Sequence, residues 1–253
     1  MDNVRGLFHL ISEAERIVVF TGAGISTESG ISDYRSKGGL WERFQPVTIQ
    51  EFVASAEKRK EYWQAKLELY QSFQTTRPNA GHLAITQLET WGKLRGLITQ
   101  NIDGLHQMAG TAPEKILEIH GSNRETICLD CGDLKPWAEV YERLKNGEEA
   151  PLCTKCQGLL KPNTISFGQP LDPHVLQKAV EWSRDCDLFL ALGSTLIVEP
   201  AASLPRLAKQ SGAKLAIITL SETPLDSLSD LRINASISDT LGQALKSMKE
   251  KVK

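Results

Sequence analysis

Four short apolar runs, each ending in glycine or polar residues, constrain the fold of this chain more than any other feature. They cover residues 17–20, 96–99, 187–193 and 214–220, and a weaker fifth run covers 233–237. Helical patterns of apolar residues occur at 3–15, 82–94 and 173–182. Continuous hydrophobicity is typical of strands that are buried on both faces. The alternation therefore predicts an α/β fold with a doubly wound parallel sheet.

Two stretches interrupt the alternation of strands and helices. Residues 37–80 carry a polar and aromatic helical pattern, and residues 125–162 carry four paired cysteines. Neither stretch has the pattern of a strand–helix–strand unit, so we interpret both as insertions. The remaining large domain is then assembled from three segments of the chain: 1–36, 81–124 and 163–253.

The composition indicates a folded protein without a general affinity for nucleic acid. Apolar residues make up 41% and charged residues 24%, which is enough for a core. The net charge is −2, so bulk nucleic-acid binding is disfavoured. No apolar run approaches the ~18–20 residues of a membrane helix, and no signal-type stretch begins the chain. We therefore expect a cytoplasmic protein, whose thiols stay reduced.

The paired cysteines indicate a metal site. Cys128 and Cys131 form one C-x-x-C pair, and Cys153 and Cys156 form a second after 21 intervening residues. This spacing is typical of a Cys₄ zinc ribbon, in which four thiolates surround one Zn²⁺ at ~2.3 Å and leave no open position. A redox pair and coincidence are the weaker alternatives. Cys186 precedes a predicted strand, and we expect it to be buried and inert.

A glycine turn follows the first apolar run. Gly22-Ala23-Gly24 suits a backbone that approaches a phosphate closely. The usual dinucleotide fingerprint has a third glycine where this chain has Thr27, so an ordinary tight turn explains the motif about equally well.

The residues that continue this turn resemble a known family. The segment GAGISTESGISDYRS at 22–36 is similar to the signature loop of the sirtuins, the NAD-dependent protein deacylases. Three more blocks are similar to sirtuin segments and follow in the family's order: TQNIDGLH at 99–106, EIHG at 118–121 and GSTL at 193–196. The cysteine pairs fall between the last two blocks, as in that family.

The resemblance implies a fold and a reaction. The large domain would be a Rossmann-like NAD-binding domain, 37–80 a helical insertion and 125–162 a zinc-ribbon small domain. The co-substrate would be NAD⁺, and a structural Zn²⁺ would be bound once per chain. In the sirtuin reaction the acyl-amide oxygen attacks C1′ of the ribose and nicotinamide leaves. A base then activates a ribose hydroxyl, and the products are free lysine and O-acyl-ADP-ribose.

The resemblance also assigns catalytic roles. His120 is the expected general base, because a neutral imidazole accepts a proton near pH 7. Asn101 and Asp103 are the expected polar partners at the nicotinamide ribose; from the residues alone, an Asx turn explains them equally well. Of the remaining histidines, His82 and His106 lie in sirtuin-like blocks, and we interpret both as structural hydrogen-bonding groups.

Binding contacts follow from the same comparison. Arg35 would contact phosphate or ribose, Tyr34 would cover the nicotinamide, and the other positions would line the NAD⁺ site. The complete set of expected NAD⁺ contacts is Gly22, Ala23, Gly24, Thr27, Tyr34, Arg35, Gln100, Asn101, Ile102, Asp103, His120, Gly193, Ser194, Thr195 and Thr219. An apolar tunnel for the acyl-lysine would be formed by Ile165, Phe167 and Val198, which suits an uncharged acyl chain.

Four positions depart from the sirtuin pattern. Ser32 and Tyr34 stand where Pro and Phe are usual, Gln169 replaces a Glu, and Thr219 replaces an Asn at the adenosine ribose. Their effects on affinity and rate do not follow from the sequence. Desuccinylating relatives have a Tyr and an Arg three residues apart before the Pro-Asn segment, where this chain has Lys66 and Leu69. We therefore expect acetyl rather than an acidic acyl group.

The predicted function is NAD-dependent deacetylation of protein lysines. The alternatives are mono-ADP-ribosyl transfer to protein, which shares the first chemical step, and a non-catalytic NAD⁺ sensor. Hydride transfer is disfavoured, because the base is matched to a ribose hydroxyl. The expected partners are acylated proteins or peptides, without nucleic acid or membrane, and the expected state is a monomer or weak oligomer. The bacterial and archaeal sirtuins are the most similar.

Overall fold

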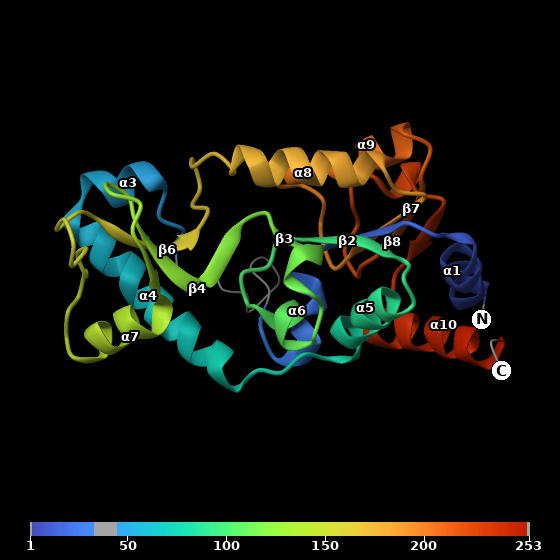
Figure 1. The fold of residues 1–253 in the computed structure, drawn as a ribbon, viewed down its shortest axis with the longest axis horizontal. Helices are drawn as coiled ribbons and strands as arrows, with labels where there is room; N and C mark the ends of the chain where they lie inside the picture. The colour runs from blue at the N-terminus through green and yellow to red at the C-terminus, as the bar shows by residue number, and fades with distance from the viewer. Residues whose placement is uncertain (1, 33–44, 252–253) are drawn as a thin grey trace.

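The computed structural model describes residues 2–32 and 45–251, and it has a large and a small lobe (Figure 1). The large lobe is built on a parallel sheet of strand order β3-β2-β1-β7-β8-β9. Its strands are β1 (Ile17–Thr21), β2 (Leu94–Thr99), β3 (Ile116–Glu118), β7 (Leu188–Leu192), β8 (Lys214–Ile218) and β9 (Leu231–Ile233). Every residue of β1 and β7 is buried, as their continuous hydrophobicity predicts.

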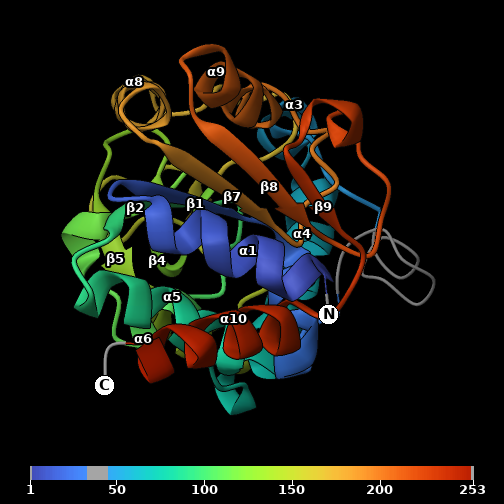
Figure 2. The ribbon, with the colours of Figure 1, turned by 90° about the vertical axis from the view of Figure 1, so that its right-hand side faces the viewer.

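Helices cover both faces of this sheet (Figure 2). One face packs against α1 (Asp2–Glu13), α5 (Ala80–Thr90) and α10 (Ile237–Lys251), and the other against α8 (Pro173–Arg184) and α9 (Leu204–Gln210). Leu7, Ile85 and Leu241 are fully buried on the first face. Ala179 and Trp182 are buried on the second. The fold is therefore a doubly wound α/β sheet of Rossmann type, as predicted.

The small lobe combines the two stretches that interrupt the alternation. An antiparallel sheet of order β5-β4-β6 contains β4 (Gly121–Cys128), β5 (Leu134–Pro136) and β6 (Leu160–Thr164), with α7 (Trp137–Lys145) beside it. Two helices from the other stretch, α3 (Ile49–Ala54) and α4 (Ala56–Thr75), complete the lobe (Figure 1). Trp63 of α4 stacks on Trp137 of α7 at 5.6 Å between ring centroids, so the two stretches share one core. The domain boundaries given above remain a prediction.

One predicted strand is wrong. The fifth apolar run, residues 233–237, is the end of β9 and the start of α10 rather than one strand. Ile233 and Ile237 both enter the core. Between them, the Ser236 side chain accepts a hydrogen bond from the Asp239 N–H at 3.1 Å, which is typical of a helix start. Two buried isoleucines in different elements therefore produced the strand-like pattern.

A short helix, α6 (Leu105–Met108), follows β2. Among the described residues, no helix is long and apolar enough to cross a membrane.

Candidate active site

A cavity of about 1220 Å³ lies at the carboxyl edge of the parallel sheet, and α4 and the end of β6 form its other wall. The segments that follow β1, β2, β3, β7 and β8 all reach this edge. Strand β1 lies between β2 and β7, so the chain order reverses here. Open α/β sheets bind ligands at this kind of switch point.

Two glycine-containing turns pack backbone against backbone at the cavity. The Gly24 N–H donates to the Gly193 carbonyl at 2.9 Å. A Cβ at Gly24 would lie 2.8 Å from Gly193 Cα, and one at Gly22 would lie 2.8 Å from the Gly193 oxygen. Gly193 itself has φ +64°, and a Cβ there would meet the Ile25 nitrogen at 2.4 Å. The glycines are therefore required by the contact between the turns, whatever else binds there.

Polar side chains after β2 connect these turns. The Ser194 hydroxyl donates to the Gln100 amide oxygen at 2.8 Å. The Asn101 amide nitrogen donates to the Gly22 carbonyl and to Ser26 Oγ, each at 3.2 Å. Its two donated bonds fix the orientation of the amide, which leaves the Asn101 oxygen as an acceptor.

Asp103 is bonded to neighbouring residues and is not part of the cavity lining. Its carboxylate accepts from the Ser26 hydroxyl at 2.7 Å and from the Leu105 N–H at 3.0 Å. Burial raises the pKa of Asp103, and these two hydrogen bonds oppose the rise. Asp103 therefore orients the Ser26 hydroxyl, whose oxygen accepts from the Asn101 amide.

His120 lies between β3 and β4 and faces the cavity. Its Nδ1 lies 3.2 Å from the Gln100 carbonyl oxygen. A carbonyl can only accept, so Nδ1 carries the proton and the Nε2 lone pair is free. Burial lowers the pKa of His120, and the Gln100 contact opposes this only partly. The ring is thus neutral at pH 7 and able to accept a proton at Nε2.

The cavity brings together most of the predicted site. It is lined by Ala23, Gly24, Thr27, Gln100, Asn101, Ile102, His120, Gly193, Ser194, Thr195 and Thr219, and by the predicted tunnel residues Ile165, Phe167 and Val198. Gly22 and Asp103 are adjacent to it but not part of its lining. Tyr34 and Arg35 lie outside the described residues.

A tight turn at 166–169 contains Phe167, one of the predicted tunnel residues. The Ser166 N–H donates to the Gln169 side-chain oxygen at 3.2 Å, and the Ile49 N–H donates to the Phe167 carbonyl at 2.9 Å. Phe167 is 45% exposed, unusual for a large apolar ring, and it lines the cavity. Gln169 therefore has a definite role in this turn, although it lacks the charge of the usual Glu.

Sequence reasoning compared Lys66 and Leu69 with acyl-specifying residues of relatives but missed that α4 forms a wall of the cavity. Tyr62, Lys66 and Leu69 line the cavity, while Trp63 on the same helix is buried in the small lobe. The polar and aromatic pattern of this helix does not by itself indicate which side faces the cavity. That assignment needs the stacking of Trp63 on Trp137, which joins residues distant in sequence.

The four paired cysteines form a metal-binding cluster. Their sulfur atoms all lie within 4.8 Å of one another, and no disulfide joins them. The Cys128–Cys156 and Cys131–Cys153 sulfur distances are 3.5 and 3.8 Å, close to the edge of about 3.8 Å in a tetrahedral ZnS₄ site. This donor set fits Zn²⁺ with no position left for substrate. Cys186 is buried, as predicted, and donates to the Ser183 carbonyl at 3.3 Å.

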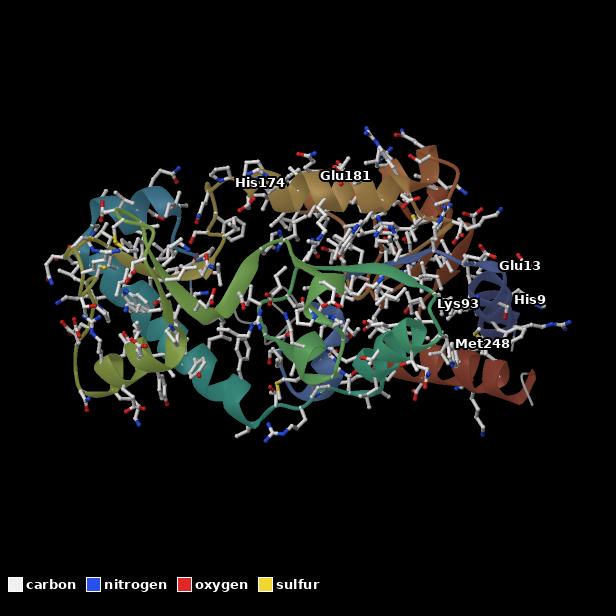
Figure 3. The ribbon with its side chains drawn as sticks, viewed as in Figure 1. His9, Glu13, Lys93, His174, Glu181 and Met248 are labelled. Atoms are coloured by element: carbon white, nitrogen blue, oxygen red, sulfur yellow. The ribbon has the colours of Figure 1, made fainter. Side chains whose placement is uncertain are left out.

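The remaining histidines are not part of the site. His82 and His106 are buried with their rings 4.8 Å apart, and His106 contacts the Thr21 hydroxyl at 3.0 Å. His9 and His174 lie on α1 and at the start of α8, on the outside of the large lobe (Figure 3).

Comparison with known proteins agrees with this geometry. The profile of the Sir2 family matches residues 22–200. An NAD-dependent protein deacetylase of Rhodopseudomonas palustris is 45% identical over 239 residues, which is 94% of each chain. A solved structure of Sir2 with p53 peptide and NAD⁺ has a TM-score of 0.88 at 33% identity, over 98% of this chain and 99% of that one. One of Sir2 bound to acetylated peptide has a TM-score of 0.85 at 33% identity, over 98% of each. With the parallel sheet, the four-cysteine cluster and the paired glycine turns all accounted for, the chain belongs to the Sir2 family.

Proposed function

We propose that this protein removes acetyl groups from protein lysines in an NAD-dependent reaction. The observation that carries the proposal is the environment of His120. Its imidazole is neutral, its Nδ1 is bound to the Gln100 carbonyl, and it lies in one cavity with both glycine turns and the Ile165–Phe167 segment. A dinucleotide and an extended acyl-lysine can meet at the free Nε2 in this arrangement.

The large-lobe wall holds NAD⁺. The backbone N–H of Ala23 suits the pyrophosphate, whereas that of Gly24 is already bound to the Gly193 carbonyl. Gln100, Asn101 and Ser194 suit the ribose and carboxamide groups. Thr219 at the end of β8 contacts the adenosine side with a shorter reach than an Asn. Tyr34 and Arg35 remain proposed contacts from the family resemblance alone. When bound, NAD⁺ supplies the ribose carbon from which nicotinamide departs and the hydroxyl that receives the acyl group.

His120 acts as the general base. Its Nε2 takes the proton of a ribose hydroxyl, and the Gln100 carbonyl stabilises the imidazolium that results because Nδ1–H remains its donor. Asn101 is positioned by its two donated bonds to orient a ribose hydroxyl or a water with its free oxygen. Asp103 does not contact the substrates but positions Asn101 indirectly, because it accepts the hydroxyl hydrogen of Ser26.

The opposite wall receives the acyl-lysine. Ile165, Phe167 and Val198 offer an apolar sleeve that accepts an uncharged acyl chain and rejects a free ammonium, whose desolvation is costly. An extended peptide adds its backbone beside the 165–169 segment, so recognition depends little on sequence. The zinc site lies apart from this chemistry: Cys128, Cys131, Cys153 and Cys156 hold Zn²⁺ to stabilise the small lobe.

The test is an incubation of the purified protein with an acetyl-lysine peptide and NAD⁺, followed by mass spectrometry. We expect nicotinamide, deacetylated peptide and O-acetyl-ADP-ribose in equal amounts. His120→Ala should abolish turnover and leave NAD⁺ binding, measured by calorimetry, within a few-fold of wild type. ADP-ribosylated protein with the acetyl group retained would refute deacetylation. NAD⁺ binding without turnover on any acyl-lysine peptide would identify a sensor instead.

A further inference from the structure

A lysine side chain is fully buried at the boundary between the lobes. Lys161 on β6 has no exposed surface. Its ammonium donates to the Pro162 carbonyl at 3.0 Å and to the Thr164 carbonyl. Among the described residues, no carboxylate bonds to it. Burial of a cation without an opposite charge is costly, so its hydrogen bonds to the two carbonyls must offset that cost.

The Thr164 carbonyl belongs to a peptide unit that also contacts the proposed base. The N–H of the same unit is that of Ile165, and it donates to the His120 carbonyl at 2.8 Å. The unit is thus bound at both ends, by an ammonium at its oxygen and by His120 at its nitrogen. A positive charge at the oxygen polarises the amide and strengthens its N–H as a donor.

Tyr62 on α4 completes this cluster. Its ring is 8% exposed, and its hydroxyl lies 3.5 Å from Thr164 Oγ1. The Lys66 ammonium lies 5.4 Å from the centroid of the same ring. Burial would raise the pKa of Tyr62, but the charges of Lys66 and Lys161 and its hydroxyl hydrogen bonds lower it to about 8. Burial lowers the pKa of Lys161, and Tyr62 opposes that lowering.

We propose that Lys161 is a positioning residue for the deacetylation reaction: its buried ammonium holds the peptide unit between Thr164 and Ile165 and, through it, the backbone of His120. The inference rests on the proposed function. His120 is then held twice, at its ring by the Gln100 carbonyl and at its main chain by the Ile165 N–H. The same contact sets the start of the apolar sleeve, because Ile165 lines the cavity.

Lys161→Met tests this role, because methionine keeps most of the stem and removes the charge. We expect kcat on the acetyl-peptide to fall at least about 10-fold, since small displacements of a catalytic group cost this much. The NAD⁺ Kd, measured by calorimetry without peptide, should stay within about 2-fold. Lys145→Met is the matched control, because Lys145 lies on α7 with its side chain 48% exposed. A kcat equal to that of the control, or an equal loss of NAD⁺ affinity, would overturn the proposal.

A second measurement does not depend on that variant folding. The ultraviolet titration of wild type minus that of Tyr62→Phe isolates the ionisation of Tyr62. A midpoint near pH 8 is the value expected when Lys66 and Lys161 are both charged beside Tyr62, and a midpoint at the ordinary value near 10 overturns a charged Lys161 there. In folded Lys161→Met the midpoint should rise. If wild type consumes no acetyl-peptide, the proposed function fails, whereas the titration still tests whether Lys161 is charged beside Tyr62.

Discussion

Replacing Gly24 by Ala separates two explanations of the glycine turn. If the glycine serves only the approach of a phosphate, an added methyl group harms NAD⁺ binding and leaves the unliganded protein intact. The structure indicates a different reason, because a Cβ at Gly24 would lie 2.8 Å from both Cα and O of Gly193. The φ of Gly24 is not in the left-handed region, so the obstacle is steric.

The magnitude follows from this geometry. An ordinary contact begins near 3.4 Å, so the two backbones must separate by about 0.6 Å. Neither atom belongs to a flexible side chain, and overpacking of this kind costs about 1–3 kcal/mol. For a chain of this length 1 kcal/mol shifts Tm by about 2–4 °C, so a cost of about 2 kcal/mol lowers Tm by about 4–8 °C. The displaced turn should also raise the KM for NAD⁺.

The assay is calorimetric unfolding of the NAD-free protein. Gly242→Ala is the matched control, because nothing lies within 4 Å of a Cβ at this helical position. That variant should gain about 0.5–1 kcal/mol, since alanine favours helices over glycine. An NAD-free Gly24→Ala protein with the Tm of wild type would refute the steric argument and restore the phosphate explanation.

Three further perturbations probe the buried imidazoles, the metal site and the base. Burial lowers the pKa of His82 to about 4 and holds that of His106 well below its ordinary value, so between pH 6.5 and 4 the unfolded chain binds more protons. The free energy of unfolding, measured in urea, should be highest above pH 6.5 and should fall by about 3 kcal/mol between pH 6.5 and 4 because of His82. A free energy of unfolding that does not change over this pH range would contradict the prediction. Removal of zinc by a chelator should abolish the near-ultraviolet circular dichroism of the stacked Trp63–Trp137 pair, because two of the cysteines share their core, and an unchanged signal from metal-free protein would exclude a structural role. Because burial lowers the pKa of His120, the fall of kcat/KM toward acid pH should have its midpoint below pH 6.5, and a midpoint at or above pH 6.5 would exclude a buried neutral base.

The elements of the large lobe were predictable because their signals are local. The buried strand β1 is apolar from Ile17 to Phe20, and α8 begins with a Pro after Asp172, whose side chain accepts from the His174 N–H at 2.8 Å. The edge strand β3 has only three residues and gave no such pattern. The run at 233–237 has an apolar pattern that predicts a strand, but its two core isoleucines belong to different elements, the end of β9 and the start of α10.

The sequence by itself determined the chemistry that each segment carries: the cysteine spacing of a zinc site, the glycine turn and the histidine block. These three motifs can be recognised from the types of a few neighbouring residues and the spacing between them. Only the tertiary structure decided which groups meet. It bonded Asp103 to Ser26, made Gly24 a contact for Gly193, and placed the ammonium of Lys161 on the peptide unit that binds His120. The Ser26–Asp103, Gly24–Gly193 and Ile165–His120 contacts each join residues more than 40 positions apart, because the strands that carry them meet only when the sheets form.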